Sequence, residues 1–143
     1  MSRFIQVTPD FAVSPQISAA DFAAAKAAGF AHVVNNRPDG EEAGQLTAAA
    51  AAAAAEAAGL GFTAIPISGM PGEAQVEAMA ALLDAQSGPV LAYCRSGTRS
   101  ITVWALAQAL RRAAPAEDLV AAASHAGYDL SPLAPVLQRL NQG

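Results

Sequence analysis

The chain is poor in cysteine and in charged residues. Only one of its 143 residues, Cys94, is a cysteine, so no disulfide can form within the chain. Charged residues make up 14% of the sequence and hydrophobic residues 53%, a balance that excludes a disordered polypeptide. A lone cysteine is typical of a reducing compartment, so we expect a cytoplasmic protein.

Positive charge and long apolar segments are also scarce. Eight Lys and Arg residues stand against twelve Asp and Glu residues, and the net charge of −4 argues against nucleic-acid binding. The first residues, MSRFIQ, lack the apolar segment of a signal peptide, and the apolar run at 48–55 is too short to span a bilayer. We therefore expect neither nucleic-acid nor membrane partners, although local arginines could still bind small anions.

Short apolar segments alternate with helix-like segments along the chain. Strands are expected at residues 4–7, 31–36, 62–67 and 90–93, and helices at residues 14–30, 45–61, 73–86, 100–113, 116–127 and 132–140. This alternation predicts one α/β domain over residues 1–143, with a mostly parallel central sheet flanked by helices. The segment VLAY is apolar enough to be a central strand, and Trp104, Leu106 and Leu110 are expected in the core.

The cysteine lies in the segment LAYCRSGTRS, between a predicted strand and a predicted helix. Ligands of open α/β sheets bind just beyond the carboxyl ends of strands, and a helix N-terminus attracts anions. Gly97 allows the loop amides to turn inward, and the same field lowers the pKa of a thiol. Cys94 is therefore predicted to be the nucleophile and Arg99 the catalytic anion clamp. The remaining loop residues expected to bind the anion are Arg95, Ser96, Gly97, Thr98 and Ser100.

A second group of charged residues follows the strand at 31–36, on the same edge of the sheet. Arg37 either borders the anion pocket or is held in an ion pair by Glu41 or Glu42, and the sequence leaves both open. The carboxylates themselves are expected to be structural. His32 and His125 have no nearby ligand partners, so neither a metal site nor a cofactor is expected.

Two resemblances narrow the function. The loop CRSGTRS, preceded by VLAY, resembles the active-site loop of single-domain rhodaneses, which are sulfur transferases. The segments ISAADFAAAKAAGFAHVVNNRPDGEE, AAGLGFTAIPIS and GPVLAYCRSGTRS resemble the phosphatase-like domain, of DUF442 type, that is found fused to β-lactamase-fold hydrolases. This resemblance covers about residues 8–113 and implies the fold of cysteine-based dual-specificity phosphatases. It also implies a β-lactamase-fold hydrolase as a partner.

The loop is one residue shorter than the phosphatase motif. That motif has five residues between cysteine and arginine, whereas Cys94 and Arg99 have four between them. By resemblance, the acid that protonates the leaving oxygen would lie at Ser68 or Gly69, and neither residue can do so. Glu73 is the nearest carboxylate, and it is expected to stabilise the first turn of the following helix.

Three functions therefore remain, in decreasing order of expectation. The first is sulfur transfer from thiosulfate or a persulfide through a Cys94 persulfide, which needs no such acid. The second is phosphate hydrolysis through a Cys94 phosphocysteine, which the overall resemblance favours. The third is a module that binds a small anion without catalysis.

Overall fold

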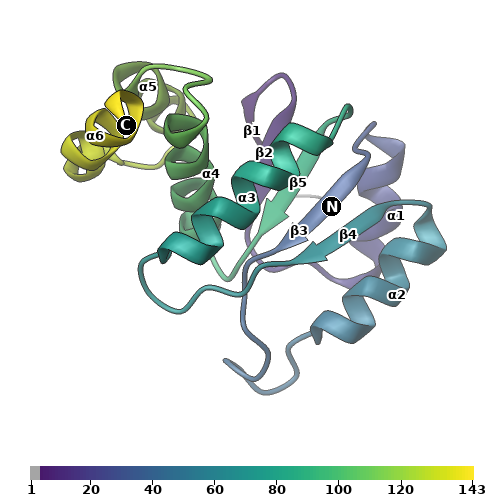
Figure 1. Ribbon diagram of the computed structural model, residues 1–143. Coiled ribbons are helices and arrows are strands. Elements are labelled where there is room, and N and C mark those ends of the chain that lie inside the picture. Colours follow the sequence, from purple (N-terminus) through teal and green to yellow (C-terminus); the bar gives the residue numbers. More distant parts are fainter. Residues whose placement is uncertain (1–3) are drawn as a thin grey trace.

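A five-stranded sheet forms the centre of the computed structural model, which describes residues 4–143 (Figure 1). The sheet order is β1-β2-β5-β3-β4, and only the edge strand β1 runs antiparallel to its neighbour. The strands are β1 (Ile5–Thr8), β2 (Phe11–Ser14), β3 (His32–Asn35), β4 (Gly61–Ala64) and β5 (Val90–Tyr93). The prediction of a mostly parallel α/β sheet is confirmed, and VLAY is its central strand.

The strand β2 is not predicted from the sequence. All four residues of this strand, FAVS, are buried, and the strand pairs with β1 on one side and β5 on the other. A four-residue segment that ends before Pro15 carries too little periodicity to be distinguished from a turn. Its omission matters because β2 lies beside the strand that ends at Cys94.

Helices cover both faces of the sheet (Figure 1). The helices α1 and α2 pack on one face, α3 and α4 on the other, and α5 and α6 lie beyond α4. The helical elements are α1 (Ala19–Ala27), α2 (Ala48–Ala58), α3 (Glu73–Ala85), α4 (Thr98–Leu110), α5 (Ala116–His125), the short 3₁₀ helix η1 (Ser131–Leu133) and α6 (Ala134–Gln142). The helix after the cysteine thus begins at Thr98, two residues earlier than predicted.

The alternation of side chains along β5 connects two apolar layers. Val90 and Ala92 face α3 and α4, whereas Leu91 and Tyr93 face α1 and α2. This burial on both faces explains why the strand is apolar throughout.

The predicted core of α4 is only partly correct. Trp104 and Leu106 are buried, and the Trp104 ring stacks on Phe11 at 5.2 Å between centroids. Leu110 is 39% exposed, because it is the last residue of the helix and lies beside an open apolar groove.

Within residues 4–143, no helix is both long and apolar enough to cross a membrane. The expectation that a signal peptide is lacking rests partly on residues 1–3, which lie outside the described residues. The assignment of the whole chain to one domain stays a prediction.

Candidate active site

Cys94 lies at the carboxyl end of the central strand and begins the loop to α4. The cysteine is completely buried, and its backbone N–H donates to the carbonyl of Ser14 on β2 at 3.4 Å. Gly97 adopts φ +93°, a conformation that favours glycine, and its N–H donates to Cys94 Sγ at 3.1 Å. The loop therefore turns the amide of Gly97 toward the sulfur.

The electrostatics of this loop favour the thiolate. Burial alone would raise the pKa of the Cys94 thiol, but hydrogen bonds from the backbone N–H groups of Ser100, Ser96, Arg99 and Gly97 outweigh it. The pKa of Cys94 is consequently lowered. A thiolate that is stabilised by backbone donors at a helix N-terminus is suited to nucleophilic attack.

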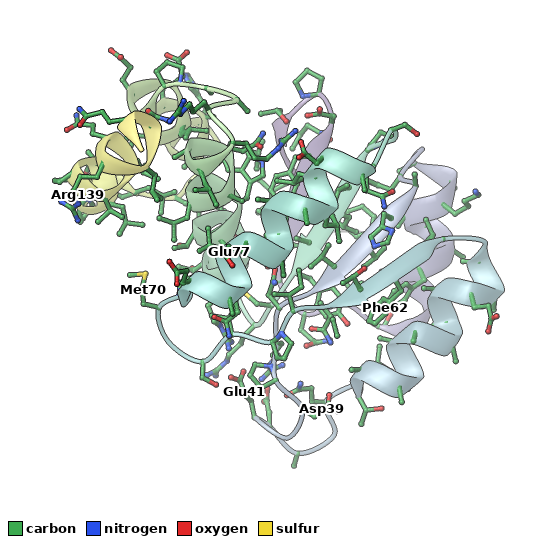
Figure 2. The ribbon with its side chains drawn as sticks, in the orientation of Figure 1. Asp39, Glu41, Phe62, Met70, Glu77 and Arg139 are labelled. Atoms are coloured by element: carbon green, nitrogen blue, oxygen red, sulfur yellow. The ribbon has the colours of Figure 1, made fainter. Side chains whose placement is uncertain are left out.

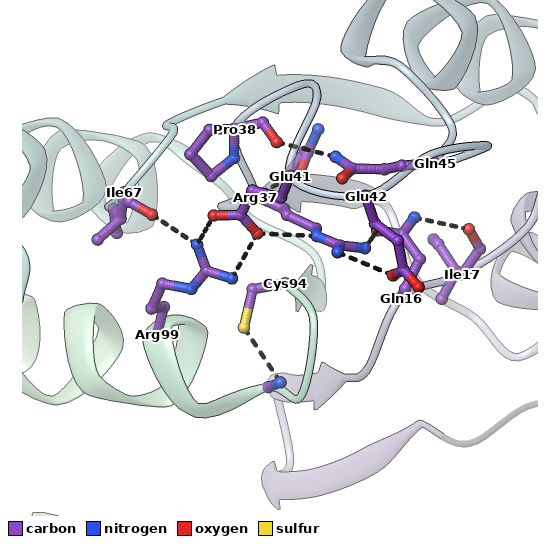
Figure 3. A network of polar contacts seen from close by, with 12 residues as sticks. Gln16, Ile17, Arg37, Pro38, Glu41, Glu42, Gln45, Ile67, Cys94 and Arg99 are labelled. Atoms are coloured by element: carbon purple, nitrogen blue, oxygen red, sulfur yellow. Dashed lines mark hydrogen bonds and ion pairs between the residues drawn. The ribbon is translucent and has the colours of Figure 1, made fainter. Parts of the chain in front are cut away.

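Arg99, in the first turn of α4, is bound by a carboxylate from another loop (Figure 3). Its Nη1 donates to Glu41 Oε2 at 2.7 Å and to the carbonyl of Ile67 at 2.8 Å, and its Nη2 donates to Glu41 Oε1 at 2.9 Å. The hydrogen bonds to Glu41 raise the pKa of Arg99, burial opposes the rise, and the charge of Cys94 adds to it. Arg99, which is predicted to bind the substrate anion, thus lies near the sulfur and is paired with the carboxylate of Glu41.

Arg37 belongs to the same network but is more deeply buried. Its side chain is 3% exposed, and it donates to Glu41 at 2.9 Å, to Gln16 at 3.0 Å and to Glu42 at 3.2 Å. Glu41 therefore lies between the two arginines (Figure 3). Hydrogen bonds from Arg99 first, and from Arg37, lower the pKa of Glu41 to about 2. Arg37 has both of the ion-pair partners that the sequence offered as alternatives.

The other predicted anion-binding residues differ in their surroundings. Arg95 is exposed, and within residues 4–143 its side chain makes no hydrogen bond or ion pair. The hydroxyls of Ser96 and Thr98 are bonded to each other at 3.0 Å. Ser100 is buried, and its N–H contributes to the sulfur although its hydroxyl has no partner within the described chain.

The loop between β4 and α3 supplies no acid. Its residues 65–72, IPISGMPG, contain no carboxylate, and Glu73 lies in the first turn of α3 as expected. The loop contributes a different group, the carbonyl of Ile67, which holds Arg99. Glu41, rather than a residue of this loop, is the carboxylate that pairs with Arg99 of the cysteine loop, and Figure 2 shows it near Asp39 in the loop below the sheet.

Tyr128 was missed by the sequence analysis. It follows α5, and its hydroxyl donates to the carbonyl of Ser96 at 2.8 Å. Burial first, and then the charge of Cys94, raises the pKa of Tyr128. A tyrosine more than thirty residues from the cysteine gives no signal in a single sequence, because only the packing of α5 brings it to the loop.

Comparisons with known proteins identify the family of the chain. Residues 3–111 match the family model described as "Beta-lactamase hydrolase-like protein, phosphatase-like domain". Curated beta-lactamase hydrolase-like proteins of Agrobacterium fabrum (strain C58) and Xylella fastidiosa (strain 9a5c) are 34% and 30% identical over 138 residues. These matches cover 96% of this chain but 32% of each relative, so the chain spans about a third of the length of the curated relatives it matches.

Solved structures show the same fold. A candidate phosphatase from Neisseria meningitidis Z2491 superposes with a TM-score of 0.80 at 30% identity, over 95% of this chain and 96% of that one. Tk-PTP in its active form superposes with a TM-score of 0.73 at 19% identity, over 97% and 96% of the two chains. Human DUSP28 superposes with a TM-score of 0.67 at 17% identity, over 99% of this chain and 95% of that one. At such identities the last two show the fold alone, and that fold is the dual-specificity phosphatase fold expected from the sequence. The protein belongs to the family of the phosphatase-like domain of beta-lactamase hydrolase-like proteins.

Proposed function

We propose that this protein is a cysteine-dependent phosphatase that acts through a covalent intermediate on Cys94. One observation carries the proposal: the N–H of Gly97, at the N-cap of α4, donates to Cys94 Sγ at 3.1 Å, backbone N–H groups of this loop lower the pKa of the thiol, and the Arg99 guanidinium lies near it. Groups aimed in this way can hold the oxygens of a transferred oxyanion and stabilise the charge that develops there. The family and the fold support the same reaction in preference to the sulfur transfer that ranked first on sequence grounds.

The reaction takes place in two steps. The Cys94 thiolate attacks phosphorus, an S–P bond forms, and the P–O bond to the leaving group breaks. Water then attacks the phosphocysteine, the S–P bond breaks, inorganic phosphate leaves and the thiolate is regenerated. Because residues 65–72 hold no carboxylate, this loop cannot protonate the leaving oxygen, so aryl phosphates, whose leaving groups are weak bases and need little protonation, are the best substrates on this proposal.

Sulfur transfer is the second candidate, and a specific feature favours it. Only four residues separate Cys94 from Arg99, one fewer than in the phosphatase motif, and a shorter loop suits a single sulfur atom better than the three oxygens of a phosphoryl group. The thiolate would attack the outer sulfur of thiosulfate, the S–S bond would break, and sulfite would leave with the electron pair. The resulting Cys94 persulfide would pass its outer sulfur to a nucleophile such as cyanide, which restores the thiolate.

One preparation can be tested for both reactions. Aryl phosphate hydrolysis and thiosulfate-to-cyanide transfer are measured side by side, with Cys94→Ser as the blank, and the intact mass is recorded after each substrate. The proposal expects Cys94-dependent hydrolysis and the mass of one phosphoryl group on trapped protein. A persulfide with no hydrolysis above the blank would replace the phosphatase by the sulfur transferase. Anion binding without either adduct would leave the non-catalytic module.

A further inference from the structure

An open pocket of about 680 Å³ lies beside the cysteine loop, between the β2–α1 segment and the β3–α2 loop. Of residues 94–99, all of which the structure describes, Arg95 alone lines this pocket. The N–H of Gln16, a further residue of the wall, donates to the Arg95 carbonyl at 3.2 Å and joins the two segments. The residue that follows Cys94 therefore belongs to a cavity next to the reaction centre.

Arg95 is the cation of this pocket that is available to a ligand. Arg37 also lines the wall, but its side chain is 3% exposed and its guanidinium already donates to three acceptors, Glu41, Gln16 and Glu42. Arg95 is exposed, and within residues 4–143 its guanidinium makes no hydrogen bond or ion pair. A planar guanidinium without a partner can bind a carboxylate or a phosphate through two parallel hydrogen bonds.

Apolar side chains make up another part of the wall. Ile17 is buried and Leu46 is half-buried, and they come from the two segments that border the pocket. Figure 3 shows Ile17 on the side of Arg37 that faces away from Arg99. A pocket with apolar surface and one available cation suits an apolar group that carries a negative charge.

The charges of the wall favour an anion. Arg37, Arg95 and Glu42 line the pocket, so its formal charge is +1 in a chain whose net charge is −4. Asp21 accepts from the N–H of Ser18, a wall residue, and so caps α1. The start of α1 is thus already satisfied, and the attraction for an anion comes from Arg95.

We infer that the leaving group of the substrate occupies this pocket, where Arg95 binds a second anionic group, a carboxylate or a further phosphate. This inference rests on the proposed function, in which Cys94 and Arg99 bind the phosphoryl group that is transferred. Consecutive Cα atoms lie about 3.8 Å apart, so an aryl ring on that phosphoryl group is long enough to reach the Arg95 side of the loop. The substrate class is an aryl phosphate whose leaving group carries a second acidic group. Arg95 is accordingly a specificity residue and takes no part in the transfer itself.

Two exposed arginines provide a matched pair of variants. Arg95→Gln removes the charge at the pocket and keeps a polar side chain. Arg139→Gln removes the same charge from α6, where Arg139 is exposed and its guanidinium also has no partner within the described residues. Comparison of the two variants separates the local effect of Arg95 from the effect of the net charge of the chain.

The test compares ligands that differ only in a second anionic group. Phenyl phosphate and its 3-carboxy and 4-carboxy derivatives are titrated by calorimetry into the full chain carrying Cys94→Ser, alone and combined with Arg95→Gln or Arg139→Gln. The measured quantity is the ratio of the affinity for the better carboxylated ligand to the affinity for phenyl phosphate. We expect Arg95→Gln to lower this ratio by about fivefold and Arg139→Gln to change it by less than about twofold. Neither substitution should change the affinity for phenyl phosphate by more than about twofold.

Three outcomes of this titration overturn the inference. A ratio near one before either arginine is replaced would show that the pocket binds no second anion. Equal weakening of all three ligands by Arg95→Gln would make Arg95 part of the clamp on the transferred group. Equal changes of the ratio in Arg95→Gln and Arg139→Gln would reflect only the net charge of the chain.

A second pair of variants tests whether the second anion lies in the pocket. Ala43→Glu adds a carboxylate to the wall from the β3–α2 loop, and Ala121→Glu adds one to the exposed face of α5, outside the pocket. Ala43→Glu should lower the ratio by about threefold, because the added charge repels the second anion or pairs with Arg95. Ala121→Glu should change it by less than about twofold. A ratio that falls in Arg95→Gln but not in Ala43→Glu would place the second anion outside the pocket and overturn the inference.

The affinity ratio needs no turnover, so it is separable from the proposed function. If phenyl phosphate binds but no aryl phosphate modifies Cys94, the proposed function fails while the ratio can still be read. If an adduct forms but the ratio does not respond to Arg95→Gln, only the role of Arg95 fails. If none of the three ligands binds, the site holds no phosphate ester and both fail.

Discussion

Two loops at the same edge of the sheet build the site in different ways. The loop from β5 to α4 acts on its own residues, since the N–H of Gly97 binds the sulfur of Cys94 three positions earlier. The loop from β3 to α2, residues 36–47, acts at a distance, since Glu41 binds Arg99 across 58 residues. The first supplies donors to the sulfur and the second supplies acceptors to the guanidinium.

The two loops differ in whether their contacts are set by a contiguous sequence motif or by the tertiary fold. Amides directed at a sulfur follow from strand, glycine and helix in succession, and they make a nucleophile wherever that succession occurs. A carboxylate on the arginine follows only from strand order, because β3 and β5 are neighbours whose carboxyl ends lie together. The β5–α4 loop thus provides reactivity, and the β3–α2 loop provides the charge environment in which it operates.

The largest expected loss of activity comes from substitution of Arg99, which lies at the start of α4 and is bound by Glu41 of the β3–α2 loop. Arg99→Lys keeps the charge but removes the planar fork, so it cannot bind Glu41 or an oxyanion through two parallel hydrogen bonds. We expect kcat/KM for the better of the two candidate reactions to fall by about 10²-fold or more. Arg111→Lys, which alters an ion pair with Asp84 away from the loop, serves as the control. Nearly unchanged turnover in Arg99→Lys would mean that Arg95 is the clamp.

Gly97→Ala tests the local loop alone. A side chain at φ +93° is strained, and its Cβ would overlap the hydroxyl of Tyr128. We expect the free energy of unfolding, measured with urea, to fall by about 2–3 kcal/mol. Gly127→Ala is the control, because that glycine also has positive φ but a Cβ there meets no atom within 4 Å. Equal losses in the two variants would show that backbone strain, and not the packing of the loop, sets the cost.

The sequence allowed more of the first loop to be predicted than of the second. Cys94, Arg99 and the helix N-terminus were identified because they are contiguous and follow an apolar strand. The sequence predicts only a structural role for Glu41, since nothing in NNRPDGEE indicates that its partner Arg99 lies beyond four intervening elements, α2, β4, α3 and β5. The missed β2 and Tyr128 have the same cause, because both reach the site only through tertiary packing.

Acid should weaken the ion pairs that Glu41 of the β3–α2 loop makes with Arg99 and Arg37. The pKa of Glu41 is lowered to about 2 in the folded protein, so its contribution to stability is present above the pKa of the unfolded chain, near 4.5. That contribution is lost as the pH falls toward 2. Because this carboxylate is partly exposed and its ion pairs are screened by solvent, wild type should exceed Glu41→Gln in unfolding free energy by only about 1 kcal/mol at pH 7, and the gap should shrink between pH 5 and pH 3. Urea titrations at several pH values measure it, and a constant gap would contradict the assignment of the low pKa to Glu41.

The smallest expected effect on the free energy of unfolding is a difference between two tyrosine variants, Tyr128→Phe and Tyr93→Phe. Tyr128→Phe removes the hydrogen bond to the Ser96 carbonyl, made at 2.8 Å, and should cost about 1 kcal/mol in urea unfolding. Tyr93→Phe removes a buried hydroxyl that has no partner within the described residues, so it should be neutral or slightly stabilising. The Tyr128 hydroxyl also occupies the space that a Cβ at Gly97 would need, so Gly97→Ala should cost less in the Tyr128→Phe background than alone. Simple addition of the two losses would show that the Tyr128 hydroxyl is not what a side chain at Gly97 collides with.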